Sequence, residues 1–243
     1  MRPFLFLGIR AEDDAADDEH EAFCRYAGLA ASDVRRVRLE RDELGPVDLE
    51  ELSGIVLGGG PFNVSDAPET KSGAQVRTEA RLRDLTAQVV AADFPFLGAC
   101  YGIGTLGTRA GGVVDRQHAE PIGAVTITLT AGGLADPLFG DLPPTFDAFL
   151  GHQEAVSRLP AGAVLLASSA TCPVQAFRLG TRVYATQFHP ELDADGICKR
   201  IEIYRDHGYY APHEGAELLR RARAAVVTEP TRLLRRFVEL FAR

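Results

Sequence analysis

The sequence has few cysteines, and none of them stands in a CxxC pair or beside a zinc ligand at the usual spacing. The four are Cys24, Cys100, Cys172 and Cys198. No apolar stretch approaches the roughly 20 residues of a membrane span. The apolar run near the first residue is too short for a secretory signal core. These patterns predict a cytoplasmic protein with reduced thiols.

Lysine is also scarce, with only Lys71 and Lys199 present, so arginine supplies nearly all the positive charge. The net charge of −8 predicts a surface that repels nucleic acid and anionic membranes as a whole. Hydrophobic residues make up 46% of the chain and charged residues 25%, which excludes a disordered or fibrous protein. With 243 residues, the chain can bury a core without a disulfide or metal.

The first half of the chain alternates apolar runs with segments that have apolar residues at helical intervals. Strands separated by helices of this length predict βαβ units and a parallel sheet. The expected strands are residues 4–9, 34–39, 54–57 and 94–97, and the expected helices are residues 17–27 and 69–92.

The second half has short apolar segments joined by short connections, which predicts antiparallel or mixed pairings. The expected strands are residues 113–115, 123–129, 146–150, 164–168, 174–179 and 183–187. Three helices are expected at residues 195–207, 214–227 and 231–242. No linker is evident, so we predict one domain, 1–243, with a core of about 1–195 and a helical extension of about 196–243. The predicted fold is α/β, a mostly parallel central sheet flanked by helices.

The first candidate site is the pentapeptide Gly98-Ala99-Cys100-Tyr101-Gly102, which follows an apolar strand and precedes a predicted helix. Small residues two positions either side of Cys100 allow a tight strand-to-helix turn that lifts its side chain clear of the sheet. The start of a helix favours the thiolate, which is the nucleophilic form. By itself this motif is equally consistent with a buried cysteine in a glycine-rich turn.

The second candidate is Gln187-Phe188-His189-Pro190-Glu191, at the end of a predicted strand. A thiol nucleophile needs a base, and the base needs a carboxylate that orients it. Residues two apart on an extended chain point the same way, so Glu191 can reach His189. An isolated motif of this kind is more often a surface histidine. Together with Cys100 it predicts a catalytic set at the carboxyl edge of the sheet.

The third candidate is Gly58-Gly59-Gly60-Pro61, which follows another predicted strand. Glycines there expose backbone N–H groups that can hold an oxyanion. The motif lacks the Lys-Ser/Thr ending of a phosphate-binding P-loop, and glycine turns after strands are common.

In this order, the three motifs resemble those of the class I glutamine amidotransferases with a Cys-His-Glu triad. The likeness covers about residues 1–195 and is greatest to the glutaminase domain of GMP synthases and its stand-alone relatives. It implies a flavodoxin-like fold, with Cys100 as nucleophile, His189 as general base and acid, and Glu191 orienting His189. It also implies an oxyanion hole made by the backbone N–H groups of Gly60 and Tyr101.

The resemblance further implies a set of substrate-binding residues and no cofactor or metal. Gly104 departs from the family's G-x-C-x-G-x-Q pattern, because glycine stands where a glutamine side chain helps bind the substrate. Another residue fills the gap, or the pocket is wider and takes a bulkier γ-glutamyl compound. The residues implied to bind substrate are Gly59, Gly104, Gly151, His152 and Gln153.

The expected function is hydrolysis of the glutamine side-chain amide through a cysteine thioester, giving glutamate and ammonia for a separate acceptor or synthetase. No SGGxD loop of an ATP-pyrophosphatase follows Glu191, so a whole GMP synthase is not expected. The alternatives are a γ-glutamyl peptidase or hydrolase acting on a γ-glutamyl amine, and a non-catalytic regulatory module on the same fold. The expected partners are a small-molecule substrate and a synthetase, without nucleic acid or membrane.

Overall fold

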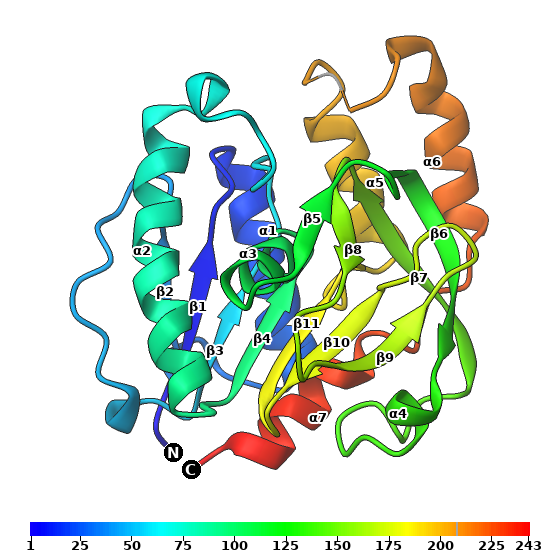
Figure 1. Cartoon of the computed structure of the whole chain (residues 1–243). Coiled ribbons are helices and arrows are strands. Elements are labelled where there is room, and N and C mark those ends of the chain that lie inside the picture. Colours follow the sequence, from blue (N-terminus) through cyan, green and yellow to red (C-terminus); the bar gives the residue numbers. More distant parts are fainter. Residues whose placement is uncertain (208) are drawn as a thin grey trace.

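The computed structural model describes residues 1–207 and 209–243, and its centre is a nine-stranded sheet. The strand order is β2-β1-β3-β4-β11-β10-β9-β6-β7, and β5 and β8 form a separate two-stranded sheet (Figure 1). The strands are β1 (Phe4–Gly8), β2 (Val34–Arg38), β3 (Gly54–Leu57), β4 (Phe96–Ala99), β5 (Val113–Asp115), β6 (Glu120–Leu129), β7 (Thr145–His152), β8 (Ala155–Arg158), β9 (Val164–Ser168), β10 (Ala176–Leu179) and β11 (Val183–Thr186). The helices are α1 (Asp13–Ala27), α2 (Gly73–Ala91), α3 (Tyr101–Arg109), α4 (Ala131–Leu134), α5 (Ala194–Ile203), α6 (Gly215–Ala224) and α7 (Arg232–Phe241).

The central sheet is mixed, with parallel pairing in one half of the sheet and antiparallel pairing in the other half. Strands β2, β1, β3, β4 and β11 run parallel, whereas β11, β10, β9, β6 and β7 pair antiparallel. The predicted α/β fold with flanking helices is therefore confirmed, and the antiparallel pairings fall in the second half of the chain as expected. Parallel pairing is limited to β11 and to the strands of the central sheet that come from the first half of the chain.

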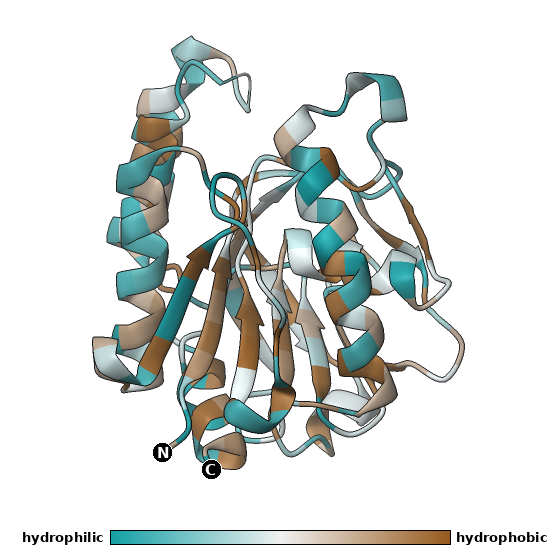
Figure 2. Cartoon of the chain, turned by 90° about the vertical axis from the view of Figure 1, so that its left-hand side faces the viewer, coloured by the Kyte–Doolittle hydropathy of each residue, from teal (hydrophilic) through white to brown (hydrophobic). Residues whose placement is uncertain are grey.

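Alternate residues of β1 show how the helices cover both faces of the sheet. Phe4 and Phe6 are buried on one face, in a cluster that includes Phe23 of α1 and Phe237 of α7. Leu5 and Leu7 are buried on the other, in a cluster with residues of α2 and α3. Figure 2 shows the brown strands between helices whose surfaces alternate between brown and teal. A strand buried on both faces needs a continuous apolar run, which β1 has.

The last helix is part of this core rather than a peripheral extension. Leu233, Leu234 and Phe237 of α7 are at most 1% exposed. The backbone N–H of Arg2 donates to the carbonyl of Arg243 at 2.6 Å, which joins the two ends of the chain. The prediction that this segment is helical is thus correct. However, α7 is not a separate extension, because it packs against α1 in one layer of the fold.

Some boundaries differ from those that the sequence predicts. Helix α2 begins at Gly73 because the Ser72 side chain accepts from the N–H of Gln75 and so caps the helix there. The short helix α4 and strand β8 were not predicted, and β8 pairs with β5 outside the main sheet. Among the described residues, no helix is long and apolar enough to cross a membrane.

Candidate active site

Three adjacent parallel strands bring the three sequence motifs to one edge of the sheet. Leu57 at the end of β3 lies opposite Gly98 of β4, and Ala99 lies opposite Thr186 at the end of β11. Strands β3, β4 and β11 lie side by side (Figure 1), so the glycine loop, Cys100 and the His189 segment that follow them leave the sheet at neighbouring points. The carboxyl edge of parallel strands is where sites in open α/β sheets form.

Cys100 occupies a strained turn between β4 and α3. Its φ of 50° and ψ of −93° lie outside the regions that residues with a side chain usually adopt. Its N–H donates to the carbonyl of Thr186 at 2.8 Å, which ties the turn to β11. A Cβ at Gly98 would come within 2.9 Å of the Gly102 Cα, and a Cβ at Gly102 would lie 3.3 Å from the Leu57 carbonyl oxygen, so glycine fits both positions best. This is the geometry of a nucleophile elbow.

Gly59 lies directly beneath Cys100 and His189. A Cβ at this position would be 2.4 Å from His189 Cε1 and 3.2 Å from Cys100 Cβ. The side chains of Cys100 and His189 therefore both pack against Gly59, and no residue larger than glycine fits at this position. The structure thus places Gly59 beside the candidate nucleophile and base, and its contact with the substrate stays a prediction.

His189 and Glu191 form a buried hydrogen-bonded pair. His189 Nδ1 lies 2.7 Å from Glu191 Oε1, and both side chains are less than a tenth exposed. Burial lowers the pKa of His189, but the charges of Glu191 and Cys100 outweigh burial and raise that pKa to about 9. Burial raises the pKa of Glu191, but the His189 and Arg200 charges outweigh it and hold that pKa below its usual range. Glu191 is therefore ionised and can orient a protonated His189.

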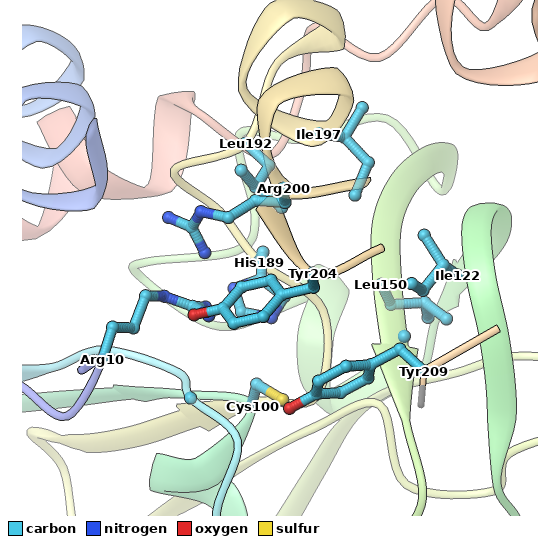
Figure 3. A pocket seen from close by; sticks show the side chains of 12 residues that line it. Arg10, Cys100, Ile122, Leu150, His189, Leu192, Ile197, Arg200, Tyr204 and Tyr209 are labelled. Carbon is cyan, nitrogen blue, oxygen red and sulfur yellow. The ribbon is translucent and has the colours of Figure 1, made fainter. Parts of the chain in front are cut away.

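Two small cavities meet at Cys100. The first, called the Arg10 cavity, has a volume of about 60 Å³ and is lined by Arg10, His189, Arg200 and Tyr204 among others (Figure 3). The second, called the Asn63 cavity, has a volume of about 30 Å³ and is lined by Asn63, Tyr101, Gln153 and Gln187 among others. Both cavities share four lining residues: Gly60, Cys100, Gly151 and Tyr209.

The residues predicted for the oxyanion hole lie beside Cys100. Gly60 lines both cavities, and a Cβ there would come within 2.4 Å of Ile9 Cγ1. Tyr101 is the first residue of α3, so its N–H has no partner within the helix. Both N–H groups remain the predicted donors to an oxyanion.

Of the residues implied to bind substrate, Gly151, His152 and Gln153 line the Asn63 cavity. The His152 ring is fully engaged, because Nε2 lies 2.8 Å from Glu120 Oε2 and Nδ1 lies 2.9 Å from the Glu154 carbonyl. His152 therefore fixes the segment rather than offering a free nitrogen to a ligand. No sequence pattern pointed to its partner Glu120, which comes from the start of β6.

Gly104 faces Glu154, which lines the Asn63 cavity, and does not itself line either cavity at Cys100. A Cβ on Gly104 would be 2.9 Å from Glu154 Oε1 and 3.2 Å from Val64 Cγ2. The Glu154 carboxylate accepts from the backbone N–H of Val64 at 2.9 Å and of Ser65 at 2.8 Å. The space beside Gly104 is thus occupied by a carboxylate that holds the loop after β3.

We expect Gly104→Gln to reduce activity rather than restore a substrate contact. The added side chain would displace Glu154 and break two charge-assisted hydrogen bonds, each contributing about 1.5–3 kcal/mol. The loop that carries Asn63 would then shift, raising the KM for glutamine and lowering the unfolding midpoint. Thr108→Gln, at an exposed position of the same helix, is the control. A lower KM in Gly104→Gln would contradict this account.

Two clusters within the described chain bring carboxylate, imidazole or thiol atoms within 4.8 Å of one another, as metal sites do. One is Glu120, His152 and Cys172, and the other is Glu19, His189 and Glu191. In each cluster the histidine is already hydrogen-bonded to a carboxylate. Hydrogen bonding within the protein therefore accounts for both groups.

Sequence reasoning missed a buried group of charges behind His189. Glu19 of α1 pairs with Arg10, with 3.0 Å between Arg10 Nε and Glu19 Oε1, and Arg200 of α5 lies 3.7 Å from the same oxygen. The hydroxyl of Tyr204 accepts from Arg10 Nη1 at 3.2 Å. Arg10 lies two residues after the end of β1, at the carboxyl edge of the sheet, and this position is the one signal that the sequence carries.

The family model described as "Glutamine amidotransferase class-I" matches residues 14–210, which include all three motifs. The chain belongs to the class I glutamine amidotransferase family. The chain is 32% identical over 181 residues to a GMP synthase (glutamine-hydrolyzing) of Thermosipho africanus, covering 69% of this chain but 31% of that protein. It is 30% identical over 154 residues to a GMP synthase (glutamine-hydrolyzing) subunit of Thermoplasma acidophilum, covering 63% of this chain and 70% of that one. The chain thus spans about a third of the length of the full GMP synthases it matches.

Solved structures confirm the fold of the chain. A glutamine amidotransferase from Thermotoga maritima superposes with a TM-score of 0.78 at 22% identity, covering 99% of this chain and 98% of that one. A second, from Methylobacillus flagellatus, has a TM-score of 0.75 at 20% identity and covers 100% of this chain and 96% of the other.

Proposed function

We propose that this chain hydrolyses the side-chain amide of glutamine through a thioester on Cys100. The observation that carries the proposal is the meeting of Cys100, in its strained turn, with a His189 that is hydrogen-bonded to Glu191. A nucleophile, a base and a carboxylate in this order form a triad for acyl transfer. Family membership supports the assignment.

In the proposed reaction the Cys100 thiolate attacks the amide carbon of the substrate. The N–H groups of Gly60 and Tyr101 stabilise the oxyanion of the tetrahedral intermediate. Protonated His189 gives its proton to the leaving nitrogen, so ammonia departs and a γ-glutamyl thioester remains. His189 then takes a proton from water, which attacks the thioester and releases glutamate. Glu191 keeps the imidazole oriented through both steps.

We further propose that the ammonia serves a separate synthetase. The similarity to a GMP synthase subunit of Thermoplasma acidophilum supports a chain that supplies one half-reaction of a two-part enzyme.

The test is glutamate and ammonia release by the purified chain incubated with glutamine. We expect equal amounts of the two products, since each turnover cleaves one amide. Asparagine, which is one methylene shorter, is the control substrate and should give little product. Absence of glutamate release, with the chain folded as judged by circular dichroism, would contradict the proposal.

A further inference from the structure

The position of His189 fixes the side of Cys100 on which a leaving group sits. A general acid must lie within hydrogen-bonding reach of the nitrogen it protonates. Within the described chain His189 lines the Arg10 cavity and not the Asn63 cavity. In the proposed reaction the leaving amine therefore occupies the Arg10 cavity, and the glutamyl part extends into the Asn63 cavity beside Tyr101 and Gln153.

The Arg10 cavity is lined by the guanidinium groups of Arg10 and Arg200, and departing ammonia has no negative charge that would pair with them. Arg10 and Arg200 are both about 5% exposed, and both lie near the single carboxylate of Glu19. The nearby Glu191 carboxylate is bound by His189. The two buried guanidinium groups thus face Glu19 and a Glu191 carboxylate that already binds His189, and buried charges are costly unless they are paired and hydrogen-bonded.

Arg200 is the less satisfied of the two arginines. Within residues 1–207 and 209–243, its buried Nε and Nη2 atoms have no hydrogen-bond partner. Burial and the Arg10 charge both lower the pKa of its guanidinium. An unpartnered buried donor in a native structure commonly marks the place of a missing ligand or ion. A carboxylate is the planar anion that a guanidinium binds through paired N–H donors.

We infer that the Arg10 cavity binds a carboxylate carried by the leaving amine, so that the chain also hydrolyses γ-glutamyl amino acids. This inference rests on the proposed triad chemistry and adds the class of leaving group. The cavity of about 60 Å³ is several times the 10–15 Å³ needed for one water, which suits a small amino acid such as glycine. Ile122 and Ile197 supply apolar wall beside its methylene group (Figure 3).

The chemistry is that of the glutaminase with another leaving group. Cys100 attacks the γ-carbonyl carbon, the C–N bond breaks, and the His189 proton goes to the amine of the departing amino acid. Water then cleaves the thioester, so γ-glutamylglycine and water give glutamate and glycine. The carboxylate of the leaving glycine pairs with Arg200 and Arg10 throughout.

The experiment compares kcat/KM for γ-glutamylglycine and γ-glutamylethylamide, whose leaving amines differ in the presence of a carboxylate. We expect the wild-type chain to prefer γ-glutamylglycine by at least about tenfold, as for a charge-assisted hydrogen bond. Arg200→Met keeps much of the length of the side chain and removes the charge, so the ratio should fall close to one. Lys199→Met is the matched control, because Lys199 is an exposed cation on the same helix, paired with Asp18. Its ratio should equal that of the wild type.

The wild-type comparison needs no variant, so the inference can be tested even if Arg200→Met folds poorly. We nevertheless expect Arg200→Met to keep the wild-type unfolding midpoint, because apolar replacement of a poorly paired buried charge is often neutral. Equal kcat/KM for the two substrates in the wild type overturns the inference, as does an unchanged ratio in Arg200→Met. Hydrolysis of glutamine alone also overturns it and leaves the glutaminase proposal standing. Failure to release glutamate from any of the three substrates overturns both.

Discussion

Replacing Cys100 with alanine should lower glutamine hydrolysis by at least about 10⁴-fold, because no other group can form the thioester. That loss corresponds to about 5.5 kcal/mol of transition-state stabilisation. The measurement is kcat/KM from glutamate release. The unfolding midpoint should not fall, because the alanine backbone keeps the hydrogen bond that ties the turn to Thr186.

The same hypothesis predicts which thiol a glutamine-like alkylating agent will label. Burial raises the pKa of the Cys24 and Cys198 thiols and raises that of Cys172 to about 11, so all three remain protonated near neutral pH. Diazo-oxo-norleucine should therefore modify Cys100 alone, as detected by peptide mass spectrometry. Cys24→Ala, the control, should be labelled like the wild type. Labelling of another cysteine, or full activity in Cys100→Ala, would exclude Cys100 as the nucleophile.

The sequence was sufficient to predict the meeting of the three motifs, because each follows an apolar strand and parallel strands end at one edge. Leu57, Ala99 and Thr186 then fix the register that aligns the glycine loop, Cys100 and His189. The strained conformation of Cys100 also follows from Gly98 and Gly102, since only glycine fits where the backbone approaches itself.

Contacts between distant segments could not be predicted in the same way. Glu154 occupies the space beside Gly104 because it directly precedes β8, which packs against α3, and no local pattern reports that proximity. Arg10 and Arg200 come from opposite ends of the sequence, and each looks like an ordinary surface charge in its own segment. Their burial depends on Glu19, which α1 supplies. Tertiary packing, and not periodicity, decides where such groups lie.

His189→Ala should be almost inactive, whereas Glu191→Gln should keep a measurable rate about 10²–10⁴-fold below the wild type. Histidine moves the proton in both steps, while the carboxylate acts through it by fixing the ring and its tautomer. A glutamine amide can donate to Nδ1 and so favour the wrong tautomer. Glu202→Gln, an exposed change on α5, is the control and should match the wild type. Equal losses in His189→Ala and Glu191→Gln would mean that Glu191 does more than orient the ring.

The pH dependence of kcat/KM separates orientation from general damage to the fold. Because Glu191 and Cys100 raise the pKa of His189 to about 9, its protonated form persists below that pH and is lost above it. The wild-type kcat/KM should therefore decline as the pH rises through about 9, since the leaving nitrogen then lacks its acid. In Glu191→Gln the burial that lowers this pKa remains, but the carboxylate that opposes it is gone, so the decline should begin at a lower pH. A variant that is merely misfolded would lose rate at every pH and keep the midpoint of the decline. An unchanged midpoint in Glu191→Gln would therefore show that Glu191 does not hold the proton on His189.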